Sequence, residues 1–288
     1  MAKVAIVTDT NCCFTIDEAR ELGIYMIPMP FIINEEIYYE GVTMSDEEFY
    51  KNLVGDVTIK TSQPSPSAIM EVWDEALKEA DELVHIPMSS SLSGTYQTSM
   101  MLAKEYNGKV QIADLRRIAI TMKESVYDGL KLAEQGCNAL EIKEKLEADS
   151  KNATIYLTIE NLKYLKRGGR LTPVAAALGT LLKIKPILTI QDSAIDSFAK
   201  ARTLAQAKSI MLKATLDDVE ARLGGKGRDN KLSIAIVHNG CNETAEEYRK
   251  VVQDAFPEQE IFIDKLSLSI AAHTGPGVIA IACIQKNI

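Results

Sequence analysis

The chain has 288 residues, 46% of them hydrophobic, and a formal net charge of −8. This length favours two domains, and the acidic charge argues against nucleic acid or an anionic membrane surface as a partner, because both present negative phosphates. No apolar stretch approaches the ~20 residues that span a bilayer, and the N-terminus lacks signal-peptide zones, so we expect a cytoplasmic protein that is not inserted in a membrane.

The N-terminal half alternates between strand and helix patterns. Val4–Val7 is an unbroken apolar run, which is typical of a strand buried on both faces. Further strands are predicted at Leu83–Met88 and Val110–Ala113, and the proline-containing segment Ile24–Tyr39 predicts two edge strands. The alternation predicts an α/β domain with a mainly parallel, Rossmann-like sheet over residues 1–153.

Three helix starts in this half carry capping residues. Thr15 and Ser45 are each followed three residues later by a glutamate, Glu18 and Glu48, which is the capping-box pattern. Asn138 has the side chain of a helix cap as well. We therefore expect helices to begin directly after these three residues.

The C-terminal half shows strands without regular helix alternation, which predicts an α+β domain over residues 154–288. The predicted strands are Ile155–Ile159, Ile187–Ile190, Ser233–His238, Ile261–Leu266 and Val278–Ile284. The predicted helices are Val174–Leu182, Leu204–Arg222 and Glu243–Phe256, and a basic turn is predicted at Arg167–Arg170.

The segment richest in hydroxyl groups is Ser89–Thr95. It leaves a predicted strand and enters a helix, and Gly94 permits the close approach of a backbone. The unpaired N–H groups of a helix start attract anions, and serine hydroxyls add neutral donors. The same residues can simply cap the helix, so the segment predicts either an anion site or a solvated loop. Thr61 and Ser62 form a second hydroxyl pair, which matters only if it faces the first.

A histidine stands beside a tight turn in the segment His273-Thr274-Gly275-Pro276-Gly277. It can donate to an anion or move protons near neutral pH, or it can be a core side chain bonded to backbone, and both interpretations stay open. Arg170 and Arg202 are candidates to neutralise a phosphate, against the ordinary alternative of solvated surface charge. The three histidines are too scattered for a metal site and no GxxxxGK[ST] loop is present, so we expect no metal and no cofactor.

Taken in order, six segments of the sequence resemble the DegV family over essentially the whole chain. They are Val7–Asp9, Thr61–Ser65, Ser89–Thr95, Leu165–Arg170, Ile184–Leu188 and His273–Gly277. Each segment is a weak signal alone, and the set is specific in this order and at these spacings.

The resemblance implies a long-chain fatty acid bound in an apolar tunnel between the two domains. It implies that Thr61 and Ser93 hold the carboxylate near His273. The further candidate ligand-binding residues are Ser62, Ser91, Gly94, Thr95 and Thr274.

Several family members act as the acyl-binding subunit of a bacterial fatty acid kinase, so the resemblance implies a lipid-binding subunit without turnover of its own. It also implies a partner, a separate ATP-dependent kinase subunit of the dihydroxyacetone-kinase-like type, which makes acyl-phosphate for phospholipid synthesis. Arg170 and Arg202 would contact that partner or the phosphate.

Two alternatives remain beside this function. The family's fold is related to the substrate domains of dihydroxyacetone kinases, so the chain could be a small-molecule phosphotransfer enzyme that uses His273. A different acid or a protein partner is the other alternative, because Leu115–Ala119 replaces the Ser and small residues usual in the family. Arg116 or Arg117 would there narrow the pocket or pair with an acid.

Overall fold

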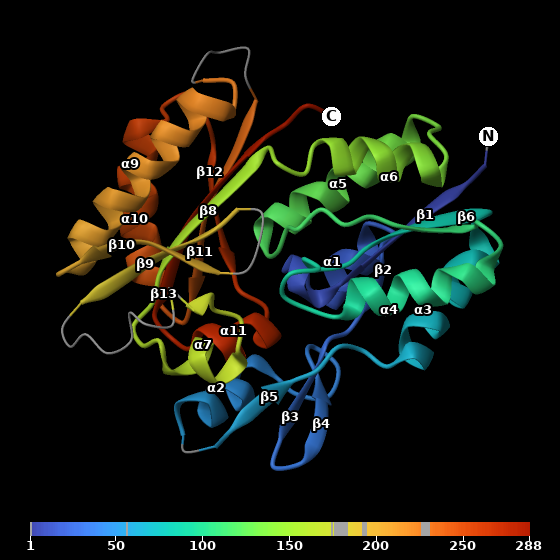
Figure 1. Ribbon diagram of the computed structural model, residues 1–288, viewed down its shortest axis with the longest axis horizontal. Helices are drawn as coiled ribbons and strands as arrows, with labels where there is room; N and C mark the ends of the chain where they lie inside the picture. Colours follow the sequence, from blue (N-terminus) through green and yellow to red (C-terminus); the bar gives the residue numbers. More distant parts are fainter. Residues whose placement is uncertain (1, 56, 174, 176–183, 192–194, 226–230) are drawn as a thin grey trace. The chain divides into compact units, whose positions relative to one another are not determined.

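The computed structural model describes residues 2–55, 57–173, 175, 184–191, 195–225 and 231–288. The chain forms two compact units (Figure 1). The first comprises Met1–Lys151 with Ser267–Ser269 and Ile288, and the second comprises Asn152–Leu266 with Ile270–Asn287. Apart from Ala175, the predicted helix Val174–Leu182 lies outside the described residues.

The first unit is built on a four-stranded sheet in the order β2-β1-β6-β7, and all its strand pairs are parallel. The strands are Tyr25–Ile27 (β2), Val4–Asp9 (β1), Glu82–Ile86 (β6) and Val110–Ile112 (β7). The parallel α/β sheet predicted from the strand–helix alternation is confirmed. Because the strands are parallel, their carboxyl ends lie along one edge of the sheet, where ligands bind in such folds.

Helices cover both faces of this sheet (Figure 1). Trp73 packs with Val7 in the core on one face, whereas Gly129 on the other face lies against the side chain of Ile6. Alternate residues of β1 thus face opposite helix layers, as expected of a strand buried on both sides. The helices are Pro66–Glu79 (α3) and Thr95–Leu102 (α4) on the first face, and Ile120–Glu134 (α5) and Ala139–Ala148 (α6) on the second.

The predicted helix starts in this unit are found. Thr15 precedes α1 (Ile16–Glu21), Ser45 precedes α2 (Asp46–Val54), and Asn138 precedes α6, each in a complete capping box. These boxes satisfy N–H groups that the first helical turn leaves unpaired, which is why a purely local pattern located the three starts.

The segment Ile24–Tyr39 differs from its prediction of two edge strands. It holds β2 and then a hairpin of β3 (Pro30–Ile33) and β4 (Glu36–Tyr39). β3 is the central strand of a second sheet, because β5 (Ile59–Thr61) pairs with its other side. Pro30 is accommodated as the first residue of β3, where its carbonyl oxygen accepts a hydrogen bond from the Ser62 N–H.

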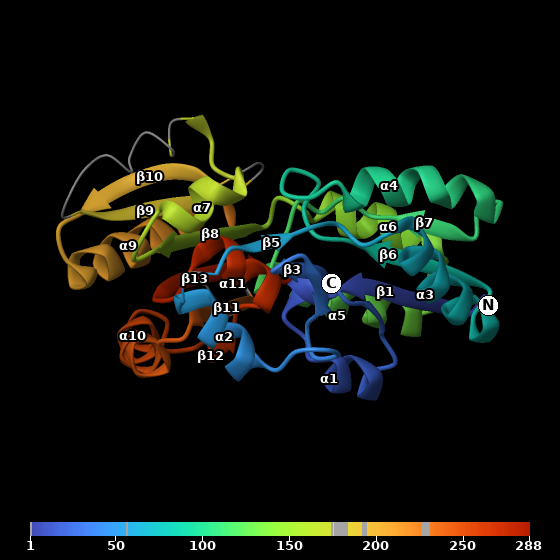
Figure 2. The ribbon, with the colours of Figure 1, turned by 90° about the horizontal axis from the view of Figure 1, so that it is seen from below.

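The second unit is built on a six-stranded mixed sheet in the order β10-β9-β8-β13-β11-β12. β11 and β12 are parallel, and the other neighbouring pairs are antiparallel. The strands are Ala153–Thr158 (β8), Lys185–Ile190 (β9), Asp196–Ala201 (β10), Leu232–Asn239 (β11), Ile261–Lys265 (β12) and Val278–Gln285 (β13). Two helices, α9 (Leu204–Arg222) and α10 (Asn242–Ala255), share one apolar core with this sheet (Figure 2).

Three elements in the C-terminal half of the chain were not predicted. β10 is an edge strand in which half of the residues are polar, and it pairs with β9 across a register shift. A helix, α7 (Lys163–Gly168), precedes the predicted basic turn and includes its first two residues, and the chain turns at Gly169 in the left-handed conformation with φ 67°. The apolar stretch before His273 belongs to a short helix, α11 (Leu268–Thr274).

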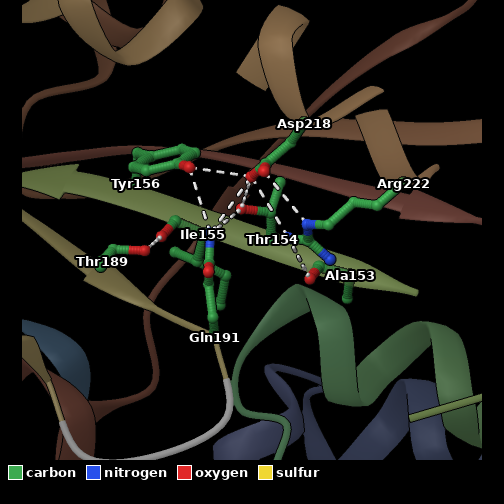
Figure 3. A network of polar contacts seen from close by, with 8 residues as sticks. All are labelled: Ala153, Thr154, Ile155, Tyr156, Thr189, Gln191, Asp218 and Arg222. Carbon is green, nitrogen blue, oxygen red and sulfur yellow. Dashed lines mark hydrogen bonds and ion pairs between the residues drawn. The ribbon is translucent and has the colours of Figure 1, made fainter. Parts of the chain in front are cut away.

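A polar network at one end of the second sheet holds α9 to the strands (Figure 3). The Asp218 carboxylate accepts hydrogen bonds from Thr154 Oγ1 at 2.7 Å and from the Tyr156 hydroxyl at 2.8 Å. Arg222 and Gln191 also donate to this carboxylate. Burial opposes ionisation of Asp218, but these donors outweigh it and lower the pKa of the carboxyl. The carboxylate oxygens of Asp218 are thus bonded within the second unit, and we infer that the network stabilises the fold.

Candidate functional site

Three neighbouring strands of the first sheet end in polar segments at one edge. β1 ends at Asp9, β6 leads into Ser89–Thr95, and β7 leads to Asp114. Ser90 Oγ donates to the Asp114 carboxylate at 2.5 Å, and the Ser89 N–H donates to the carbonyl of Arg117. The Ser-rich segment is therefore fixed on one side by the segment that follows β7.

Asp9 fixes this segment from the other side. Its carboxylate is fully buried and accepts hydrogen bonds from the Met88 N–H at 2.9 Å and from the backbone and side chain of Asn11. Burial raises the pKa of Asp9 to about 6, although the hydrogen bonds act in the opposite direction. Asp9 therefore holds the start of the Ser-rich segment in place.

Ser93 and Thr95 form a hydroxyl pair at the start of α4. Ser93 Oγ lies 2.8 Å from Thr95 Oγ1 and also accepts the Thr95 N–H at 3.2 Å. Gly94 precedes the first residue of α4 and provides no side-chain cap. Neutral hydroxyl donors beside a helix N-terminus are suited to a carboxylate, because they can bind it without a buried cation.

The second hydroxyl segment lies against the first. The side-chain amide of Gln63 donates to Thr98 Oγ1 of α4 at 2.9 Å, and its oxygen approaches Gly94 so closely that it would overlap with a β-carbon there. Thr61 is half-buried at the end of β5, and Ser62 is exposed. The contact between the two segments is made by Gln63, and the ligand-binding role of Thr61 and Ser62 stays a prediction. We call Thr61, Ser62, Ser91, Ser93 and Thr95 the hydroxyl cluster.

The close approach expected at Gly94 occurs, but a side chain makes it. Gly94 has an ordinary helical φ of −74°, so its backbone places no demand on glycine. The close contact is with the end of the exposed Gln63 side chain, which would have to move to admit a side chain at position 94.

The second unit brings its own candidates together around His273. The imidazole packs directly on the backbone of Gly168, at the end of α7, and a β-carbon there would overlap with Nδ1. The Arg170 guanidinium donates to the Gly168 carbonyl oxygen and lies close enough to affect His273 electrostatically. Burial, and then the positive charge of Arg170, lower the pKa of His273 to about 4. The imidazole is therefore neutral at physiological pH.

The turn after His273 is tightly packed. Gly275 and Gly277 have φ of 74° and 79°, the left-handed region that favours glycine. The Tyr164 ring lies against Gly275, and the Thr274 hydroxyl donates to the Ile270 carbonyl at 3.1 Å. Thr274 is 4% exposed, and its hydroxyl proton is already donated within α11. In the predicted ligand contact, the Thr274 hydroxyl could therefore act only as an acceptor.

The basic candidates occupy different environments. Arg170 is half-buried beside Gly168, whereas the side chain of Arg202 is exposed directly after β10. Of the two arginines in the departing segment, Arg117 is 5% exposed, lies 3.6 Å from the Asp149 carboxylate and donates to Ser125 Oγ. Arg117 is therefore held inside the first unit, and its expected effect on the ligand pocket stays a prediction.

Sequence reasoning did not single out Gln63 or Gly168 as site residues. The signal for both was present, because each lies in a segment that carries the family resemblance. Across the part of the chain that the structure describes, no group of His, Cys, Asp and Glu side chains could hold a metal ion. In the same part, no helix has the length and apolar character needed to cross a membrane.

Comparisons with known proteins agree with this architecture. The sequence model of the DegV family matches residues 3–286, and its description reads "uncharacterised protein, DegV family". A DegV domain-containing protein of Clostridium acetobutylicum is 31% identical over 290 residues, with 99% of each chain covered.

Solved structures are similar over the full length as well. A fatty acid binding DegV family protein from Thermus thermophilus is 27% identical, with a TM-score of 0.89 over 99% of this chain and 100% of that one. DegV from Bacillus subtilis, a fatty acid binding protein, is 24% identical, with a TM-score of 0.86 over 99% of this chain and 100% of that one, and we take from it the fold alone.

Proposed function

Since the chain belongs to the DegV family, we propose that it binds a long-chain fatty acid and holds the carboxylate on the hydroxyl cluster. The observation that carries the proposal is the contact of two hydroxyl segments, from β5 and from the start of α4, through Gln63 and Gly94. The related protein from Thermus thermophilus, which binds fatty acid, supports the ligand class.

The chemistry of the cluster suits this ligand. Hydrogen bonds to an ionised carboxylate are roughly twice as strong as neutral ones, so two or three hydroxyl donors can replace much of its hydration. Burial of the acyl tail supplies the remaining affinity at ~0.8 kcal/mol for each methylene group. We further propose that the neutral imidazole of His273 is an additional donor to the bound acid.

The finer part of the proposal concerns a partner. We propose that the chain has no turnover alone and presents the carboxylate to a separate ATP-dependent kinase subunit, which forms acyl-phosphate. The exposed Arg202 and the half-buried Arg170 are the proposed contacts to that subunit or to the transferred phosphate. We also propose residues 1–153 as the domain of the hydroxyl cluster and 154–288 as the domain of the basic and His273 segments.

The test is denaturing extraction of the purified protein, followed by mass spectrometry of the released lipid. We expect a fatty acid in about equimolar amount. If none is extracted, the delipidated protein is titrated with palmitic and oleic acids. A protein that carries no lipid and takes up neither acid would contradict the proposal.

A further inference from the structure

Asn239 is a buried polar residue that neither the sequence motifs nor the proposed function uses. It is the last residue of β11, and its side chain is fully buried. Its carboxamide donates a hydrogen bond to the Gly275 carbonyl oxygen at 2.5 Å. Its backbone carbonyl accepts the Gly277 N–H at 2.8 Å. One residue of β11 therefore holds both glycines of the turn that follows α11.

This turn fixes the end of α11. The Gly275 N–H donates to the Ala271 carbonyl at 2.8 Å, so the turn continues directly from the helix that carries His273. Cys241, just after β11, strengthens the attachment by donating from Sγ to the Val278 carbonyl at 3.1 Å. If the turn shifts, the last helical turn shifts with it, and His273 loses its contact with Gly168.

We propose that Asn239 is a positioning residue for His273: by binding the Gly275–Gly277 turn, it holds the imidazole on the backbone of Gly168 and beside Arg170. This role of Asn239 depends on the proposed function in one respect: the proposed function supplies the ligand that His273 binds.

The chemistry of the position requires a neutral donor of this length. The Gly275 carbonyl oxygen lies in a buried environment, and a buried acceptor without a donor is costly. An aliphatic side chain at position 239 would leave that oxygen without the amide proton. The left-handed conformations of Gly275 and Gly277 leave few other ways to build the turn.

A residue that only stabilised the end of the sheet would make the same hydrogen bonds, so the experiment must separate the two roles. Titration of His273 does so. Its neutrality depends on burial against Gly168 and on the charge of Arg170, and both are lost if the imidazole moves. The chain has three histidines, and a His273→Asn spectrum assigns the relevant NMR signal.

The test compares Asn239→Ala with Thr154→Ala. Thr154 is a matched control, since its buried side chain also makes a hydrogen bond in the same sheet. It lies away from the Gly275–Gly277 turn, because it pairs with Cys283, which is five residues beyond Val278 at the start of β13. Imidazole signals are followed from about pH 8 to about pH 4.5 in the lipid-free proteins. We expect His273 to stay mostly neutral in the wild type and in Thr154→Ala. In Asn239→Ala its pKa should rise by about one unit or more toward the ordinary value of ~6.5.

The second readout is affinity for oleic acid, which we expect to fall about three- to tenfold in Asn239→Ala and to stay unchanged in Thr154→Ala. A wild-type titration curve for His273 in Asn239→Ala would overturn the proposal, whatever the change in melting temperature. If Asn239→Ala does not fold, Asn239→Ser is tested by the same criterion. A wild-type protein that binds no fatty acid would refute the proposed function, and the lipid-free His273 titration would still decide the role of Asn239.

Discussion

The carboxamide oxygen of Gln63 approaches Gly94 so closely that it would overlap with a β-carbon at position 94, and this contact joins the two hydroxyl segments. Its consequence can be measured, because φ of Gly94 is −74° and alanine fits that backbone without strain. Gly94→Ala therefore changes the fit of Gln63 rather than the backbone.

We expect Gly94→Ala to weaken fatty acid binding about tenfold, with little effect on the melting temperature, because the added methyl group pushes Gln63 and its loop away from α4. Isothermal titration with oleic acid measures the effect. The control is the double variant Gln63→Ala/Gly94→Ala, compared with Gln63→Ala alone. Without the Gln63 side chain there is no overlap, so Gly94→Ala should reduce the affinity for oleic acid less than it does in the wild type. An equal loss of affinity with and without Gln63 would mean that the contact does not organise the site.

Ser93→Ala tests the hydroxyl cluster itself. Removal of this hydroxyl leaves the ligand carboxylate short of one donor, and we expect the binding free energy to weaken by about 1–3 kcal/mol. Because Ser93 Oγ also accepts the Thr95 N–H, the variant loses one hydrogen bond at the start of α4 as well. Ser45→Ala is the control for that loss, since Ser45 Oγ accepts a backbone N–H at the start of α2. An unchanged dissociation constant for Ser93→Ala would remove this residue from the site.

The success of the sequence prediction depended on how local each signal was. The capping pattern at Thr15 and the extent of Leu204–Arg222 were correct, because a helix start and a long helical periodicity are encoded within a few turns. β10 was missed because the edge strand Asp196–Ala201 lacks an unbroken apolar run and is ordered by its partner β9. α11 was missed for a related reason: the Leu268 N–H at its start is bonded by the distant carboxylate of Glu40.

The candidate site shows the same limit. The residue types at Ser93 and His273 indicated an anion-binding chemistry, but the contacts that place them are made by distant segments. Gln63 reaches the Ser-rich segment, and Gly168 supports His273 from the other end of the second unit's sequence. No local pattern encodes such contacts, and only the resemblance to a family linked the segments.

Arg202→Ala addresses the proposed kinase partner. The side chain of Arg202 is exposed, so its loss should leave both the fold and the affinity for fatty acid unchanged. We expect acyl-phosphate formation with the kinase subunit and ATP, measured as acyl-hydroxamate, to fall about tenfold or more, since a lost charged contact at an interface costs ~2 kcal/mol or more. Arg249→Ala, an arginine on α10 paired with Glu246, is the control and should behave as the wild type. Equal losses of binding and of product in Arg202→Ala would refute the division between ligand and partner contacts.

His85 lies in β6 against the ring of Trp73, the single tryptophan, with 5.7 Å between the ring centroids. Its ring nitrogens have no hydrogen-bond partner among the described residues, and burial lowers its pKa to about 3 from an ordinary 6.5. Between these values the unfolded chain binds a proton that the folded chain does not. The free energy of unfolding is therefore unaffected by His85 above about pH 6.5 and falls below it, by up to ~1.4 kcal/mol per pH unit.

His85→Phe removes this acid sensitivity, because phenylalanine keeps the ring against Trp73 and takes up no proton. Urea unfolding followed by Trp73 fluorescence at about pH 7.5 and about pH 5 measures it. At the higher pH we expect the variant to lie within about 1.5 kcal/mol of the wild type, since the two rings are similar in volume. At the lower pH it should gain about 1–2 kcal/mol relative to the wild type. A parallel decline of both proteins would mean that His85 takes up its proton without unfolding of the first unit, and that its burial does not limit stability in acid.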